Sequence, residues 1–381
     1  MTDFYNDLNY PGSELHSQQA REKIGRISIN KAEPIVKASD IAYILFNKTD
    51  LQLQKAFLVD FGFQVAQETP DALYMRGTGA LPYFYVAHKN GKLNGFFGAG
   101  YSVNSEAELH RVSEICAQPI SGIDGPGGGQ RVRLHDPDGF IVDLVWGRER
   151  VDELPQRQRP AVNTPTEKVR VNTGIRTKTG PSSVHRLGHY VLSMSNFEES
   201  IQWYMRHLGI IPTDVQCLED GTPALAFNRL DKGATPADHH TVVLVQNAAA
   251  EYMHSAYETL DIDSIGQGQQ HLKLNGWNHF WGIGRHILGS QVFDYWLDPT
   301  GDELEHYADG DVFDAEFETR YHPLDMGSLW AWGDDVPPAM RPHFSLKRMI
   351  AAFRAIKSGK IEPKTLGMLK KAMELPARPW F

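Results

Sequence analysis

The first third of the chain passes from strand-like to helix-like spacing of its apolar residues. The run "SDIAYILF" at 39–46 is apolar and predicts a buried strand. Over 48–63 the apolar positions recur at helical spacing, and Gly62 marks the end of the predicted helix. Thr49 and Gln52 are placed to form a capping box at its start. The apolar stripe of this helix consists of Leu53, Phe57 and Phe61.

The second half of the chain repeats this pattern. After several short strand candidates, residues 148–183 are rich in Pro, Thr and basic residues, which is typical of a linker. Residues 185–210 then follow the same order of strand, cap and helix, with Ser195 and Glu198 as the expected cap. The helical face there consists of Phe197, Ile201, Tyr204 and Leu208. The closing motif "DPTGDELE" also matches the earlier "DPDGFIVD", so the pattern indicates duplicated domains.

A finer repeat lies within the second half. In one unit, the first predicted strand begins at His189 and the last, residues 238–245, contains His240. In the next unit, the first predicted strand contains His254 and the last, residues 302–308, contains Glu305. His240 follows His189 by 51 positions (240 − 189), and Glu305 follows His254 by 51 positions (305 − 254). If the two units pack around a pseudo-twofold axis, all four side chains should face one cavity.

Two imidazoles and one carboxylate directed into one cavity form the facial triad that suits non-haem Fe(II). We therefore predict His189, His254 and Glu305 as metal ligands, with open coordination positions on the other side of the ion. A single His on a strand is more often a packed or surface residue, and the chain has 16 of them. The paired spacing is what favours the metal site over this simpler interpretation.

Composition narrows the class of protein further. The 381 residues are 41% hydrophobic and 22% charged, which is typical of a globular protein of two domains. The formal net charge of −9 gives no basic field for nucleic acid or an anionic membrane. Only Cys116 and Cys217 occur, outside any metal-ligand spacing, and the start of the chain has no signal-peptide pattern. We expect a cytoplasmic enzyme with no nucleic-acid or membrane partner.

The second half resembles the catalytic domain of the type I extradiol ring-cleavage dioxygenases, in the vicinal oxygen chelate superfamily. The residues that carry the resemblance are "LGHYVL", "MHSAYETLDID" and "GRHILGSQVFDYWLDPTGDELE". The resemblance spans 38–310 as two domains, although it is strong only in the second. It implies an α+β fold of tandem βαβββ modules that form two vicinal oxygen chelate domains, with an N-terminal arm and a C-terminal extension.

The resemblance also implies an activity. Such enzymes insert both atoms of O₂ into a catechol beside its hydroxyls and release a ring-opened semialdehyde-type product. Their metal is usually Fe(II) and occasionally Mn(II), and they are homo-oligomers. By the motif positions, His240 matches the acid–base His of the family, and His286 and Tyr295 match its substrate-pocket residues. A His with a pKa near neutrality suits the transfer of a catechol proton.

Five segments are predicted along the chain. They are an arm (1–37), a non-catalytic domain (38–150), a linker (151–184), a catalytic domain (185–310) and an extension (311–381) that forms a lid or a subunit contact. In the extension, residues 345–363 predict an amphipathic helix that docks on the protein surface. The docking residues expected for this helix are Met349, Ile350, Phe353 and Ile356.

The first domain departs from the motif. Alignment of the two helix ends, 147 positions apart, makes Ala42 the counterpart of His189 (189 − 147), and the match of "DPDGFIVD" with "DPTGDELE" makes Asp143 the counterpart of Glu305. The region that matches His254, residues 95–102, has no His. A lone Asp does not hold Fe(II), so we expect this half to act as a scaffold.

Two alternatives use the same scaffold. A glyoxalase-like isomerase or epimerase would bind Zn²⁺ or Ni²⁺ with four protein ligands, which requires an acid where this chain has His240. A metal-free small-molecule binding protein would not need His189, His254 and Glu305 together.

Overall fold

The computed structural model describes residues 33–381 apart from 90–92, 177–178, 325–328, 341–345 and 375–381. Its first half contains two successive units, each made of a strand, a helix and three more strands. The first unit consists of β1 (Asp40–Asn47), α2 (Leu51–Phe61), β2 (Gln64–Glu68), β3 (Ala72–Arg76) and β4 (Tyr85–His88). The second unit consists of β5 (Gly95–Ser102), α3 (Glu106–Cys116), β6 (Ile120–Gly122), β7 (Gln130–His135) and β8 (Ile141–Trp146).

The second half contains two further units of the same order. One consists of β9 (Val184–Met194), α4 (Phe197–Leu208), β10 (Ile210–Cys217), β11 (Pro223–Leu230) and β13 (Val242–Gln246). The other consists of β14 (Glu251–Thr259), α5 (Ile262–Leu274), β15 (Asn278–Arg285), β16 (Val292–Leu297) and β17 (Glu303–Ala308). The short strands β12 (Ala237–Asp238) and β18 (Val312–Phe313) pair with each other. The predicted α+β fold of tandem βαβββ modules is confirmed.

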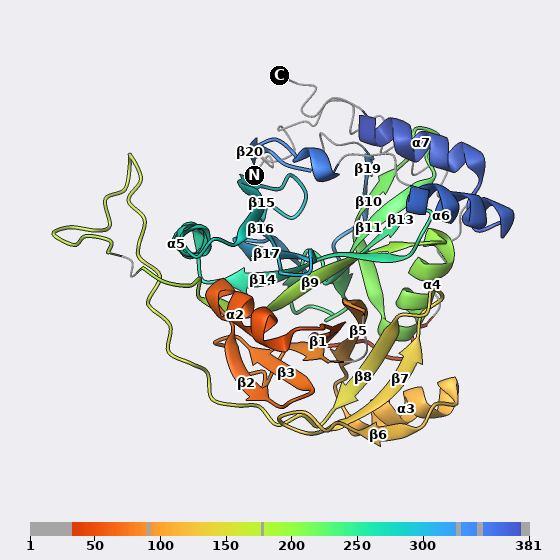
Figure 1. Ribbon diagram of the computed structural model, residues 1–381, viewed down its shortest axis with the longest axis horizontal. Helices are drawn as coiled ribbons and strands as arrows, with labels where there is room; N and C mark the ends of the chain where they lie inside the picture. Colours follow the sequence, from red (N-terminus) through yellow and green to blue (C-terminus); the bar gives the residue numbers. More distant parts are fainter. Residues whose placement is uncertain (1–32, 90–92, 177–178, 325–328, 341–345, 375–381) are drawn as a thin grey trace.

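Each half forms one sheet in which the first strands of its two units are neighbours. The order is β2-β3-β4-β1-β5-β8-β7-β6 in the first half, where β1 and β5 join the units. In the second half β9 and β14 join them. The order there is β19-β10-β11-β13-β9-β14-β17-β16-β15-β20, where β19 (Arg320–Pro323) and β20 (Trp332–Gly333) are the edge strands. The two sheets form the lower and upper parts of the molecule in Figure 1.

The helix caps lie one residue later than the sequence predicts. Asp50 caps α2 through its side chain, and Asn196 caps α4 in the same way. Ser195 is not a cap because its hydroxyl hydrogen-bonds the Asp138 carboxylate, and the same carboxylate accepts a hydrogen bond from Ser195 N (2.8 Å). In α2 the expected stripe is right for Phe57 and Phe61, which are buried. It is wrong for Leu53, which is exposed, whereas all four residues expected on the α4 face are buried.

The Asp-Pro turn of each half contacts side chains of the other half. Asp136 in the first half accepts a hydrogen bond from Tyr204 Oη of the second half (3.0 Å). In the reverse direction, Asp298 accepts a hydrogen bond from Gln54 Nε2 (3.0 Å) and pairs with Lys48 at the end of β1. The largest apolar cluster also contains residues of both halves, so the main core crosses the boundary between them.

Lys48 is expected to be essential to this boundary. Its side chain is fully buried, contacts Asp298 and lies 2.7 Å from Asp302. Lys48→Met would leave two carboxylates without their cation, so we expect the free energy of unfolding to fall by about 3–5 kcal/mol in chemical denaturation. Lys37→Met is the matched control because the Lys37–Asp231 pair is half exposed, and it should cost less than about 1 kcal/mol. Equal losses in both variants would contradict the prediction.

The C-terminal extension adds a strand to each edge of the second sheet. Strand β19 (Arg320–Pro323) pairs with β10, and β20 (Trp332–Gly333) pairs with β15. A short 3₁₀ turn (Pro338–Met340) follows, and then come α6 (Leu346–Lys357) and α7 (Pro363–Glu374), which lie at the top right of Figure 1.

The expected docking face of α6 is wrong. Met349, Ile350, Phe353 and Ile356 are all exposed, and Phe353 keeps 67% of its surface. Among the side chains of α6 that the structure describes, the buried one is Ala355, which lies on the opposite side of a 3.6-residue helix. The apolar stripe alone therefore does not say which side faces the protein. The predicted N-terminal arm lies, up to residue 32, outside the described residues.

Candidate metal centre

Strand register places the predicted ligands on one face of the second sheet. Ala256 of β14 is the register partner of His189 in β9 and of Glu305 in β17, and Tyr295 of β16 is the next residue in this row. Residues opposite each other in neighbouring strands project to the same face. His254 lies two residues before Ala256, so it projects to this face as well.

The three side chains meet at the Glu305 carboxylate. Its Oε2 lies 3.4 Å from Nε2 of His189 and 3.4 Å from Nε2 of His254, and the three potential ligand atoms lie within 4.8 Å of one another. His189 and Glu305 are buried, and neither Glu305 oxygen accepts a hydrogen bond. Among the described residues this is the one group of three or more acidic, His or Cys side chains arranged to hold a metal.

The charge states at this position fit a metal. Burial lowers the pKa of His189, which therefore has a free lone pair at neutral pH. Although burial opposes ionisation of Glu305, the neighbouring imidazoles of His189, His254 and His286 hold its pKa well below the usual range. Two neutral imidazoles and one carboxylate are the donor set of a 2-His-1-carboxylate site. The orphaned carboxylate oxygens give a divalent ion its anionic ligand without breaking a hydrogen bond.

His240 lies beside this triad, between β12 and β13. Its ring centroid is 4.0 Å from that of His189, and the side chain is buried. Burial, together with His189 and His239, holds its pKa well below the ordinary value. His240 is therefore a neutral imidazole at pH 7, which suits a proton acceptor.

His286 and Tyr295 lie on the other side of the carboxylate. Nε2 of His286 is 3.7 Å from Glu305 Oε1 and 3.1 Å from Tyr295 Oη. Nδ1 of His286 is 2.6 Å from the carbonyl oxygen of Leu329 in the C-terminal extension. Because a carbonyl only accepts, Nδ1 carries the proton in the neutral ring and Nε2 faces Tyr295. The extension therefore orients His286, and its buried Trp330 packs near Trp281.

An apolar wall continues the same face away from the triad. Val191 is the register partner of both His254 and Val243, and Val243 is the partner of Phe227. These residues belong to one cluster, whose members are Val191, Leu225, Val243, Phe227, Val245 and Leu324. An aromatic ring held at the triad would find apolar side chains on this side.

The first half has the same topology but a different set of residues. Gly100 of β5 is the partner of both Tyr43 and Asp143, so Tyr43 is the counterpart of His189 and the expected Ala42 is wrong. The error arises because α4 is one residue longer than α2: the helix C-caps are 147 positions apart (209 − 62) but the N-caps only 146 (196 − 50). Asp143 is confirmed as the counterpart of Glu305.

This counterpart site is closed by protein groups. Asp143 accepts hydrogen bonds from Tyr43 Oη (2.9 Å) and from Arg133 Nε (2.8 Å). A Cβ on Gly100 would lie 2.7 Å from the Tyr43 ring, so the ring fills the space in front of the strand. The carboxylate of Asp143 therefore has hydrogen-bond donors in the guanidinium group of Arg133 and the phenol of Tyr43. In the second half, imidazoles surround Glu305 instead.

Sequence reasoning missed three polar residues near the centre. Glu303 is the register partner of His254 on the same face, and burial raises its pKa to about 8. His239 contacts His240, and Asp214 contacts His239. His239 is next to His240 in the sequence, and Glu303 is two residues from Glu305, so both lie close to predicted site residues. Asp214 lies on β10, 25 residues before His239, where no sequence motif marks it. His306, the neighbour of Glu305 on β17, faces away from the site and hydrogen-bonds the Phe61 carbonyl (2.6 Å).

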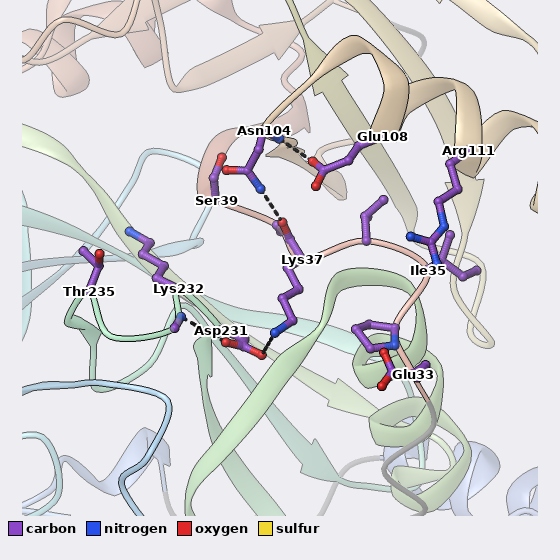
Figure 2. A pocket seen from close by; sticks show the side chains of 14 residues that line it. Glu33, Ile35, Lys37, Ser39, Asn104, Glu108, Arg111, Asp231, Lys232 and Thr235 are labelled. Carbon is purple, nitrogen blue, oxygen red and sulfur yellow. Dashed lines mark hydrogen bonds and ion pairs between the residues drawn. The ribbon is translucent and has the colours of Figure 1, made fainter.

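A separate cavity of about 560 Å³ contains none of these residues. Figure 2 shows its lining, where Lys37 crosses it to form an ion pair with Asp231 (2.6 Å) and Asn104 donates to the Lys37 carbonyl (3.1 Å). Lys37 and Asp231 are paired with each other there, and the cavity lacks the His cluster of the triad. In the part of the chain that is described, no helix combines the length and the apolar character needed to cross a membrane.

Known proteins with related sequences and structures support the assignment of the fold. No family model matches the chain. Metapyrocatechase 2 of Cupriavidus necator is 27% identical to it over 322 residues, which are 80% of this chain and 92% of that protein. An extradiol ring-cleaving dioxygenase from Brevibacterium fuscum matches its structure with a TM-score of 0.66 and 19% identity, over 83% of this chain and 87% of the other. The Mn(II)-bound glyoxalase from Novosphingobium aromaticivorans also matches, with a TM-score of 0.66 and 19% identity, over 81% and 95% of the two chains.

The glyoxalase match shows that this fold serves more than one chemistry, so activity must be argued from the site. The resemblance predicted from the motifs is nevertheless confirmed by these relatives. The chain is related in sequence to metapyrocatechase and has the tandem-module vicinal oxygen chelate fold of the type I extradiol ring-cleavage dioxygenases.

Proposed function

We propose that this protein is an Fe(II)-dependent extradiol dioxygenase that cleaves a catecholic ring next to its hydroxyls with both atoms of O₂. The observation that carries the proposal is the meeting of His189, His254 and Glu305 on one sheet face, with His240 beside them. The sequence relative named metapyrocatechase supports the same activity.

In this proposal the two imidazoles and the Glu305 carboxylate hold the metal. An Fe(II) ion held by these residues would bind the catechol and O₂ and would carry electrons between them. Mn(II) is the second candidate, because the donor set of two nitrogens and one oxygen suits both ions.

The surrounding residues act on the substrate. A chelating catechol must lose a proton, and His240 is the neutral imidazole beside His189 that can accept it. The hydrogen-bonded pair of His286 and Tyr295 borders the opposite side of the triad, where it can donate to or accept from substrate oxygens. The apolar wall around Val191 and Val243 excludes water from the ring.

The test is oxygen consumption by metal-loaded protein. Protein loaded anaerobically with Fe(II), and separately with Mn(II), is mixed with catechol, an alkylcatechol, 3,4-dihydroxyphenylacetate and a hydroquinone in air-saturated buffer. We expect O₂ uptake, one molecule per ring cleaved, with a yellow ring-opened product. A lack of uptake with every compound, at about one metal ion per chain, would overturn the proposal.

The same preparations separate the two alternatives. Isomerisation of a glutathione hemithioacetal by Zn²⁺- or Ni²⁺-loaded protein, without O₂ uptake, would favour the glyoxalase-like isomerase. Failure to retain any of the four metals, together with binding of an aromatic ligand, would favour the metal-free binding protein.

A further inference from the structure

A buried hydrogen-bond chain leads away from His240 on the side opposite the triad. Nδ1 of His240 is 2.8 Å from Nδ1 of His239, and Nε2 of His239 is 2.6 Å from Oδ2 of Asp214. All three side chains are buried, and His239 and Asp214 are completely so. Among the described residues, none of the three predicted metal ligands has a comparable chain of hydrogen bonds.

Asp214 is held as a carboxylate by the C-terminal extension. Arg320 of β19 donates two hydrogen bonds to it (2.8 Å each), and Nε2 of His322 lies 2.8 Å from its Oδ1. Burial opposes its ionisation, but the hydrogen bonds from His239 and His322 hold the pKa of Asp214 well below its usual range. The register of β10 with β19 places Asp214 directly opposite Arg320, so the pairing of these two strands holds the guanidinium group beside the carboxylate.

The direction of the hydrogen bonds follows from the anchor. An ionised carboxylate only accepts, so Nε2 of His239 carries a proton that it donates to Asp214. When the ring of His239 is neutral, its Nδ1 is then an acceptor. Nδ1–H of His240 must be the donor in the 2.8 Å contact, which leaves Nε2 of His240 with a free lone pair.

We propose that His239, anchored by Asp214, is a positioning residue that fixes the tautomer and ring orientation of His240. In this tautomer the unprotonated Nε2 is the nitrogen available to the substrate, as general-base chemistry requires. The logic is that of an acid–base His whose second nitrogen is held by a buried hydrogen-bond partner. This inference rests on the proposed function, because the role of His240 as proton acceptor belongs to that function.

Two substitutions at His239 separate positioning from folding. His239→Phe fills the space of the ring but offers no acceptor to His240. His239→Asn can place its Oδ1 near the position of Nδ1 and still accept from His240, although it loses the contact with Asp214. We expect kcat to fall about 10²-fold in His239→Phe, with KM for catechol and metal content near parental values. His239→Asn should recover at least about a tenth of the parental kcat.

The matched control is His279→Phe. His279 also contacts a fully buried aspartate, Asp294 (2.8 Å), but Asp294 alternates with Tyr295 along β16 and so points away from the triad. This control should keep kcat within about twofold of the parent while losing a similar His–Asp contact. Equal losses of kcat in His239→Phe and His239→Asn, or no loss in His239→Phe, would overturn the inference.

A second readout does not depend on turnover. In the diamagnetic Zn²⁺-loaded protein, ¹⁵N shifts of the imidazoles report which nitrogen carries a proton, and the His240 signals are assigned by their loss in His240→Asn. We expect a protonated Nδ1 and an unprotonated Nε2 for His240 in the parent and in His239→Asn, and an altered pattern in His239→Phe. A parent with Nδ1 unprotonated would refute the inference. Parent protein without O₂ uptake would instead be a failure of the proposed function.

Discussion

Replacement of Glu305 by alanine is expected to remove the metal from the protein. Glu305 is the anionic member of the triad, and two imidazole nitrogens lie 3.4 Å from one of its oxygens. Its loss leaves two neutral ligands, so we expect metal affinity to fall roughly 100-fold or more. Iron retained after desalting should become negligible, and catechol-dependent O₂ uptake should fall at least about 10³-fold.

The pseudo-symmetric position in the first half provides the control. Asp143→Asn changes the counterpart of Glu305, yet its partners there are Tyr43 and Arg133. This variant should retain the parental metal content and kcat and lose only thermal stability. If Glu305→Ala kept its iron, or if Asp143→Asn lost it, the assignment of the metal to the second half would be wrong.

Replacement of His240 by asparagine is expected to slow turnover without removing the metal. His240 is placed beside His189 but outside the group of three ligand atoms. We expect metal content near one ion per chain and a fall in kcat of about 10²–10⁴-fold, the range for loss of a general acid–base group. Metal analysis and steady-state O₂ uptake on the same sample measure both quantities.

The contrary result would identify a different enzyme. If His240→Asn emptied the site, His240 would be a fourth protein ligand, as in the glyoxalase-like alternative. Glu303→Gln is a useful comparison because Glu303 shares the face of His254 without belonging to the ligand group. It should alter KM for catechol more than metal content.

The sequence alone predicted elements whose signal is local. The helix of residues 197–208 has its whole apolar face buried as expected. Such a face is recognised from the 3.6-residue period of its own apolar residues and is buried by packing against one neighbouring surface. Errors arose where two local choices are nearly equal. Ser195 and Asn196 are both good caps, and the choice was made by Asp138, which lies 57 residues away and hydrogen-bonds Ser195.

Counting from the helix ends failed because α4 is one residue longer than α2. The helix ends suggested Ala42 as the counterpart of His189, but the strand register assigns Tyr43. One additional residue in a helix shifts by one every position that is aligned across that helix. In a strand, a shift of one residue moves a side chain to the opposite face of the sheet. The 51-residue spacing placed His240 near His189, but His240 is not the structural counterpart of Glu305. Val191 pairs with Val243 as Ala256 pairs with Glu305, so the strand register makes Val243 that counterpart.

The sequence by itself determined the tandem βαβββ plan and brought His189, His240, His254 and Glu305 together as candidates for one site. These inferences depend on periodicity, repetition and motif spacing, all of which are written along the chain. Only the tertiary structure decided that Leu329 orients His286 and that Asp214 anchors His239. Such contacts join strands far apart in sequence, and a backbone carbonyl or a single aspartate leaves no pattern by which to recognise its partner.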